Sequence, residues 1–189
     1  MAGRYKHPMA TPFEGFDLAG FWEDSEYARK TYLEVPLTHG LVAEIEAQLG
    51  VRLPPSYLAL MRSQNGGIPR SRCHSTSTPT TWAPDHIAIS GIWGVGRNKL
   101  RSLGGGFGGR FMQEEWGYPD LGVCICDCPS AGHDIVMLDY RACGPQGEPS
   151  VVHVDQEDGY AVTFLAKDFE TFVRGLVHER MFATPDGKR

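Results

Sequence analysis

The stretch that most constrains the fold is residues 49–67, LGVRLPPSYLALMRSQNGG, because it marks both ends of a helix. Pro54 and Pro55 favour a helix start, since a first-turn position needs no N–H and proline already has a helical φ. Apolar side chains then follow at the spacing of a buried helix face. Residues 65–67, Asn-Gly-Gly, can adopt the left-handed conformation of a helix C-cap, so we expect the helix to end there. The stretch offers no nucleophile and no metal-ligand set, so its role is architectural.

The charge balance restricts the kind of partner. The 189 residues suit one domain with its own core. They include 23 acidic and 18 basic residues, for a net charge of −5. This balance argues against nucleic-acid binding and would suit a basic protein partner. The alternative is that mild acidity only keeps the protein in solution.

Targeting signals and cysteine usage bear on the compartment. The first twenty residues contain no apolar run of signal-peptide length, and no window approaches the roughly 18 apolar residues of a membrane span. Five cysteines is an odd number, and three of them fall within residues 124–128. This is not the pattern of a secreted disulfide framework. We therefore expect a cytoplasmic protein with reduced thiols and no membrane association.

The order of the predicted elements indicates an α+β fold. Three helices come first, a set of strands joined by short links follows, and one helix packs back at the end. Short links favour antiparallel neighbours, because a parallel crossover needs a dozen or more residues. We expect an irregular arm at 1–21, a single domain at 22–180 and a polar tail at 181–189. The expected helices cover 22–36, 38–50, part of 49–67 and 168–178, and the strands cover 86–93, 123–128, 135–139, 151–155 and 161–165.

Cys124, Cys126 and Cys128 are the first candidates for chemistry. Alternation along a strand would place them on one face, with His133 and Asp134 just beyond a turn. A zinc site is conceivable, but structural zinc sites favour two cysteines on a tight turn, and three along one strand spread over ~13 Å. Buried thiols that fill a sheet face are the simpler interpretation. We expect no metal and no other cofactor.

The remaining candidates do not form a catalytic set. Cys143 has no paired histidine in its local sequence. His153 and Asp155 share a strand face and could do acid–base work, although a partly exposed polar sheet face explains them equally well. The glycine loop 104–109 lacks both the Lys-Ser/Thr of a P-loop and the G-x-G-x-x-G of a dinucleotide fold. The sequence therefore favours a non-enzymatic protein.

Motifs along most of the chain carry a family resemblance. They begin in the helical part and continue in order through the strands to the last helix. The matching residues are Thr38, Ile45-Glu46, Leu49-Gly50, Leu53-Pro54, Tyr57, Asn65-Gly66-Gly67, Gly132-His133-Asp134-Ile135, Leu138-Asp139-Tyr140, Gly147-Glu148-Pro149-Ser150-Val151-Val152, Phe169 and Phe172. With these motifs, residues 22–177 resemble the SUKH superfamily, which includes the yeast cell-wall-assembly regulator and many bacterial proteins.

The resemblance implies both a fold and a role. It implies N-terminal helices packed on a curved, mostly antiparallel sheet with a C-terminal helix. It also implies a non-enzymatic protein-binding domain, since bacterial members are commonly immunity proteins that neutralise a cognate toxin. The alternatives are a regulatory or scaffolding protein, or a metal-dependent protein that uses the Cys124–Cys128/His133 region.

The resemblance carries over no catalytic residue, so the partner surface must be inferred. We expect it on the concave sheet face and the flanking loops 70–84, 104–109 and 129–134. Acidic and aromatic side chains there could steer and anchor a protein partner. The candidate partner-binding residues are Trp82, Asp85, Asp127, His133, Asp134, Asp155, Glu157 and Asp158.

Overall fold

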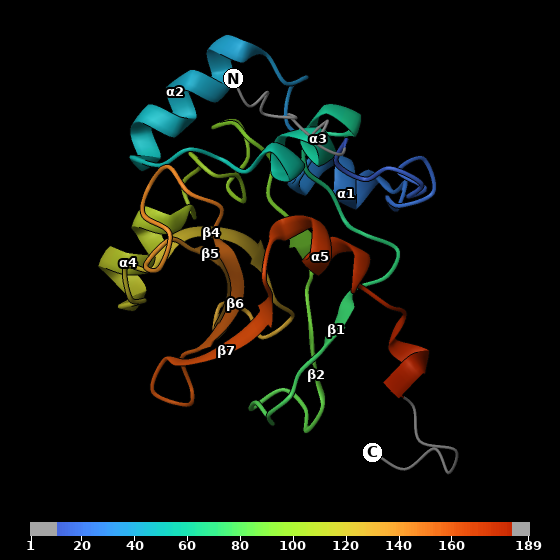
Figure 1. Ribbon diagram of the computed structural model, residues 1–189, viewed down its shortest axis with the longest axis vertical. Coiled ribbons are helices and arrows are strands. Elements are labelled where there is room, and N and C mark those ends of the chain that lie inside the picture. The colour runs from blue at the N-terminus through green and yellow to red at the C-terminus, as the bar shows by residue number, and fades with distance from the viewer. Residues whose placement is uncertain (1–10, 183–189) are drawn as a thin grey trace, which may run out of the picture.

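The computed structural model describes residues 11–182 and confirms an α+β protein (Figure 1). The elements are α1 Glu26–Thr31, α2 His39–Leu49, α3 Pro55–Ser63, β1 Cys73–Ser75, β2 His86–Ala88, β3 Gly91–Ile92, α4 Gly109–Trp116, β4 Gly122–Asp127, β5 Asp134–Asp139, β6 Ser150–Asp155, β7 Ala161–Ala166, α5 Phe169–Arg174 and η1 Glu179–Phe182. Within residues 11–182, α1–α3 precede all the strands, α4 lies between β3 and β4, and α5 and a short 3-10 helix follow the last strand.

The strands form two antiparallel sheets. The larger sheet has the order β3-β4-β5-β6-β7 and does not close, and the smaller one is the β1-β2 hairpin. Every pair of neighbours in both sheets is antiparallel. This confirms the expectation from the short links, because each of the last four strands pairs with the next along the chain.

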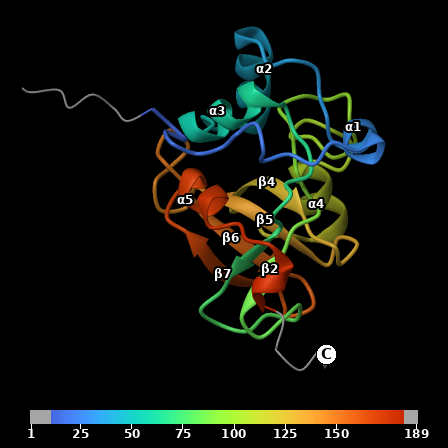
Figure 2. The same cartoon turned by 90° about the vertical axis from the view of Figure 1, so that its right-hand side faces the viewer.

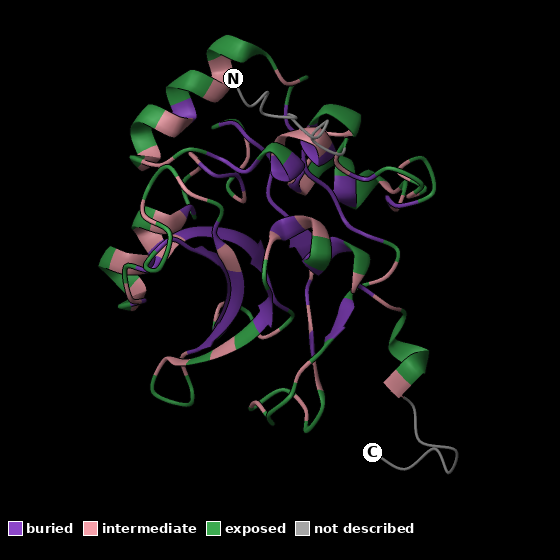
Figure 3. Cartoon of the chain, in the orientation of Figure 1, coloured by how far each residue is buried: buried purple, intermediate pink, exposed green. Residues whose placement is uncertain are grey.

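The helices cover the large sheet from several sides. The sheet is strongly curved, with α1–α3 above it, α4 on one side and α5 with the β1-β2 hairpin on the other (Figure 1). After a quarter turn, α5 and the hairpin lie in front of the sheet (Figure 2). Strands β4–β6 are buried along nearly their whole length, so the core centres on them (Figure 3).

The helix in residues 49–67 begins as predicted and ends differently. Its first residue is Pro55, so proline occupies a first-turn position. Its last residue is Ser63, and the next residue, Gln64, is extended with a φ of −160°. The helix therefore ends before residues 65–67, and the predicted left-handed C-cap at these residues is wrong.

Asn65 instead connects three segments from a buried position. Its side-chain amide donates to the carbonyls of Val35 and Val95 at 2.7 and 2.9 Å, and its oxygen accepts from the Val95 N–H at 2.8 Å. Gly66 follows with a φ of 90°, and only a residue without a side chain fits there, because a Cβ would lie 2.5 Å from the Tyr32 carbonyl oxygen. The Asn-Gly pair thus allows the chain after α1 and the chain after β3 to pack closely.

Three predicted boundaries are corrected. The first helix starts at Glu26, because Ser25 is its N-cap and accepts from the Ala28 N–H at 3.1 Å. The predicted strand 86–93 is two strands, β2 and β3, which belong to different sheets. The last α-helix ends at Arg174 rather than near 178.

A β-bulge separates the cysteines of β4. Cys124 pairs with Met137 and Cys126 pairs with Val136, so the register shifts by one residue between them. Because Val136 and Met137 are consecutive on β5, their side chains point to opposite faces. Cys124 and Cys126 therefore lie on opposite faces, and the prediction that all three cysteines share one face is wrong.

The ends of the chain pack on the body as far as they are described. Phe13 is buried, and its backbone N–H donates to Glu170 Oε1 at 2.9 Å. The Arg174 side chain donates to the Glu14 carbonyl at 2.8 Å. At the other end the Phe182 ring stacks on His86. The expected arm 1–21 and tail 181–189 extend outside the described residues, so those bounds stay predictions. Within residues 11–182, every helix is too short or too polar to cross a membrane.

Candidate functional site

The long loop between β1 and β2 is held against the end of β6. Asp155, the last residue of β6, accepts hydrogen bonds from the N–H and hydroxyl of Thr81 at 3.0 and 2.7 Å. These hydrogen bonds outweigh the effect of burial and keep the pKa of the Asp155 carboxyl below its ordinary value. Asp155 is thus a charged anchor that places the neighbouring Trp82 at this end of the sheet.

The β4–β5 turn lies at the same end. Its His133 carbonyl accepts from the Gln156 N–H at 2.8 Å, and its imidazole Nδ1 lies 3.8 Å from Glu157 Oε1. Gln156 and Glu157 begin the β6–β7 turn. Residues 76–85, 128–133 and 156–160 therefore meet at one end of the large sheet. We call them the three-loop surface.

The C-terminal end of α4 contacts two of the three loops of this surface through Trp116. The Trp116 carbonyl accepts from the Tyr160 hydroxyl at 2.5 Å and from the Gln156 amide at 3.4 Å. The Trp116 ring lies edge-on to His133 with the centroids 5.9 Å apart. Trp116 thereby contacts both turns, the β6–β7 turn through its carbonyl and the β4–β5 turn through its ring.

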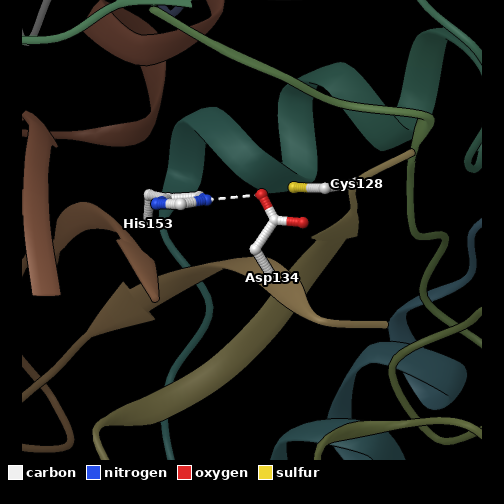
Figure 4. A group of neighbouring side chains, drawn as sticks. All are labelled: Cys128, Asp134 and His153. Carbon is white, nitrogen blue, oxygen red and sulfur yellow. Dashed lines mark hydrogen bonds and ion pairs between the residues drawn. The ribbon is translucent and has the colours of Figure 1, made fainter. Parts of the chain in front are cut away.

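A buried cluster of Cys128, Asp134 and His153 lies directly beneath the β4–β5 turn (Figure 4). His153 Nε2 donates to Asp134 Oδ2 at 2.6 Å, and the Ser130 hydroxyl donates to the other carboxylate oxygen. The side chains of His153 and Asp134 are 0% and 4% exposed. Asp134 therefore anchors the turn to β6 and cannot touch a partner in this structure.

The cluster differs from the one considered from sequence. His133 is exposed and takes no part in it, and His153, from β6, takes that place. His153 also pairs with Asp134 on the neighbouring strand and not with Asp155 on its own strand. Sequence spacing could not find the cluster, because the β5–β6 register, which pairs Val136 with His153, brings the two strands together.

The cluster is poorly suited to nucleophilic catalysis. Burial, with the neighbouring Asp134 adding to it, raises the pKa of the Cys128 thiol well above its ordinary value. At neutral pH the sulfur is therefore a thiol, whereas nucleophilic catalysis and disulfide exchange require the thiolate. Cys128 is also 3% exposed, so a substrate cannot reach it.

The donor atoms suit zinc by type and are already bonded to one another. A thiol, a carboxylate and an imidazole are all zinc ligands, and their donor atoms lie within 4.8 Å of one another. However, His153 Nε2 and Asp134 Oδ2 share a short hydrogen bond, which a shared metal ion would have to break. The arrangement fits a structural hydrogen-bond network that holds the turn.

Asp127 anchors a different part of the molecule. Its carboxylate accepts from the Tyr32 hydroxyl at 2.9 Å and the Trp93 indole at 3.0 Å, and it forms an ion pair with Arg101 at 2.9 Å. Burial raises the pKa of this carboxyl, and Arg101 is the largest opposing influence. Asp127 joins α1, β3 and the loop before α4, so it too is unavailable to a partner.

Five of the eight predicted partner-binding residues are exposed: Trp82, Asp85, His133, Glu157 and Asp158. All five belong to the three-loop surface. In the loop 104–109, the N–H groups of Gly104 and Gly105 donate to Gly96 and Ser102, and Gly104 lies against Ile45 of α2. The sequence analysis did not select Thr81, Tyr160 or Trp116 for this surface, and only strand register and loop docking reveal them.

Comparison with known proteins agrees with the fold. The model of the SMI1 / KNR4 family (SUKH-1) matches residues 36–175. The match starts after α1, later than the resemblance inferred from residue 22. No curated protein matches the chain in sequence. Because the family match covers most of the chain and all five strands of the large sheet, the protein belongs to the SMI1 / KNR4 (SUKH-1) family.

Proposed function

We propose that this protein is a non-enzymatic immunity protein that binds and neutralises a toxin through the three-loop surface. The observation that carries the proposal is the structure of that surface. Thr81 bonds the β1–β2 loop to Asp155 at the end of β6, and the Gln156 N–H bonds the β6–β7 turn to the His133 carbonyl of the β4–β5 turn, so the backbones of the three loops are held in place. Pre-organised loops lose less conformational entropy when a partner binds.

Charge supports a basic partner. Residues 111–166 contain ten acidic residues and one basic residue, Arg141, whereas the rest of the chain has 13 acidic and 17 basic residues. Arg141 is already bound to Asp139 at 2.7 Å. The three-loop surface itself contains no Lys or Arg. Such a surface would attract a basic protein at long range and speed its association.

An aromatic side chain could supply the binding energy that charge alone does not. Trp82 is 42% exposed and lies beside Thr81, which fixes the position of its loop. Tryptophan is common at the energetic centre of protein interfaces, because one ring buries a large area at low entropic cost. Around it, Glu157 and Asp158 would form a polar rim.

The direct test is co-expression with the toxin encoded by a neighbouring gene, scored by cell survival and by co-purification. The test variant is Trp82→Ala combined with Glu157→Lys, which removes the aromatic anchor and reverses one charge. Both side chains are exposed, so the variant should fold normally. We expect it to lose rescue and to bind at least tenfold more weakly.

The matched control is Glu44→Lys, a charge reversal on α2 away from the three-loop surface. It breaks a surface ion pair with Arg97, which contributes about 0–1 kcal/mol to stability. Rescue should survive this change. If the unmodified protein neither rescues growth nor co-purifies with that toxin, immunity against it is excluded. Capture of a non-toxic partner through the same surface would instead favour a scaffolding role.

A further inference from the structure

The two edges of the large sheet differ in how they are protected. At the β3 edge, Gly67 N–H donates to the Ile92 carbonyl at 3.0 Å and Ile92 N–H donates to the Gly67 carbonyl at 2.8 Å. At the β7 edge, β6 is the sole strand neighbour within residues 11–182 (Figure 1). An unpaired edge presents backbone donors and acceptors to which another strand can bind.

Apolar side chains accompany this open edge. Val162 and Phe164 of β7 are 41% and 59% exposed, while their register partners on β6, Val154 and Val152, are 0% and 3% exposed. The last two residues of β7 are buried, whereas its first four, residues 161–164, are exposed or half-buried (Figure 3). Alternate exposed apolar residues on an open edge strand are the pattern of a strand that pairs with another.

Exposed charged side chains lie at both ends of β7. Lys167 follows the strand with its side chain 78% exposed, and its nearest carboxylate, on Asp168, is 3.7 Å away. Glu157 and Asp158 precede the strand and are exposed. An antiparallel partner strand with the same sequence would place the exposed Lys167 of each copy near Glu157 and Asp158 of the other. This placement of an ammonium group near two carboxylates makes β7 complementary to a second copy of itself.

We propose that β7 pairs antiparallel with β7 of a second copy, about a two-fold axis at Thr163. With Thr163 opposite itself, Val162 of each copy lies opposite Phe164 of the other. Beyond these regular pairs, Lys167 of each copy lies near Asp158 and Gly159 at the start of the other copy's β7. The β-bulge of β7 lies beyond Phe164, so residues 161–164 remain regular. The two five-stranded sheets thereby become one continuous sheet, independently of the immunity proposal.

A cysteine at the two-fold axis tests the register directly. Thr163→Cys is made in a Cys143→Ser background, which removes the exposed native thiol. Because residue 163 faces itself across the axis, mild oxidation should yield a disulfide-linked dimer on a non-reducing gel. Ala43→Cys, on exposed positions of α2, is the control and should cross-link at least tenfold more slowly.

Charge exchange tests the orientation. Light scattering at high micromolar concentration should give twice the 20.9 kDa chain mass for the unmodified protein. Lys167→Glu should weaken the dimer at least tenfold, and adding Asp158→Lys should restore it, which a loss of folding could not do. Phe164→Lys should give a monomer with an unchanged circular dichroism spectrum.

The outcomes separate the possible occupants of the edge. A monomeric mass at every concentration, or equal cross-linking at positions 163 and 43, would overturn the proposal. A dimer that forms normally with Phe164→Lys would place the interface elsewhere and would also overturn it. Binding of another protein's strand at β7, with no self-association, would assign the edge to that partner instead.

Discussion

At the scale of single residues, burial decides what each acidic side chain does. Asp127, Asp134 and Asp155 are buried and accept hydrogen bonds from other segments, whereas Glu157 and Asp158 are exposed. A carboxylate removed from water needs such partners, because an unpaired buried charge is strongly destabilising. The buried three are thus positioning residues, and the exposed two are available to a partner.

Removing the Asp134 carboxylate should destabilise the whole protein. Asp134→Ala leaves the His153 imidazole and the Ser130 hydroxyl without their acceptor in a buried site. We expect the free energy of unfolding to fall by about 3 kcal/mol, measured by urea denaturation. The control Asp158→Ala should change it by less than about 0.5 kcal/mol. Equal effects of the two substitutions would contradict the anchoring role of Asp134.

The cysteines should differ sharply in reactivity. Cys143 is exposed, whereas the other four cysteines are buried. Burial raises the pKa of Cys124 to about 12 and those of Cys126 and Cys128 well above their ordinary values. A thiol-specific reagent should therefore modify one cysteine per native chain and five in denaturant. Rapid modification of two or more native thiols would show that the sheet opens easily.

A bound metal ion would be detected by elemental analysis and by the effect of a chelator on stability. If zinc occupied the Cys128, Asp134 and His153 cluster, purified protein would contain one equivalent by elemental analysis. Chelation would then lower the thermal midpoint. We expect neither result, because a shared metal ion would have to break the short hydrogen bond between Asp134 Oδ2 and His153 Nε2. One equivalent of zinc that is lost in His153→Ala would revive the metal-dependent alternative.

At the scale of elements, the segment after α3 does more than end a helix. Asn65 bonds the chain after α1 and the chain after β3, and Gly66 allows both to approach. The fold therefore depends on this junction as much as on the apolar face of α3. An Asn-Gly pair is typical of a helix C-cap in sequence, but here the same two residues connect segments that are distant in the chain.

Loss of the Asn65 amide should measure that junction. Asn65→Ala removes three hydrogen bonds and leaves the Val35 carbonyl and the polar groups of Val95 without this partner. We expect a loss of about 3 kcal/mol in the free energy of unfolding. Asn98→Ala, at an exposed asparagine, is the matched control and should be nearly neutral. A small effect of Asn65→Ala would mean that water replaces the amide.

At the scale of the whole molecule, buried tyrosines connect stability to alkaline pH. Burial is the largest cause that raises the pKa of four tyrosines, and neighbouring ionisable groups add to it. The four are Tyr32, Tyr57, Tyr118 and Tyr140. Their protonated forms are favoured in the folded state, so the stability they contribute is complete below the unfolded pKa of about 10. It is lost as the pH rises above that value.

Alkaline titration should show this as cooperative ionisation. We expect tyrosinate absorbance to rise in two stages, the second of which is the ionisation of the four buried rings together with unfolding. Circular dichroism should change at the second stage alone. Tyr57→Phe should lower stability below pH 10, because its hydroxyl donates to the buried Trp93 carbonyl, and should weaken the pH dependence above it. A single stage near pH 10 without unfolding would contradict the burial of these side chains.

The sequence by itself determined the class of fold, the antiparallel pairing of strands joined by short links, and the family. Helix starts at Thr38 and Pro55 are local, because a cap or a proline acts within one turn. Short links likewise determine that neighbouring strands pair antiparallel. Only the tertiary structure decided which residues meet: the bulge that separates Cys124 from Cys126, the pairing of Asp134 with His153, and the docking of Thr81 on Asp155. These contacts join residues far apart in the chain, so they depend on register, curvature and burial, which no local pattern encodes.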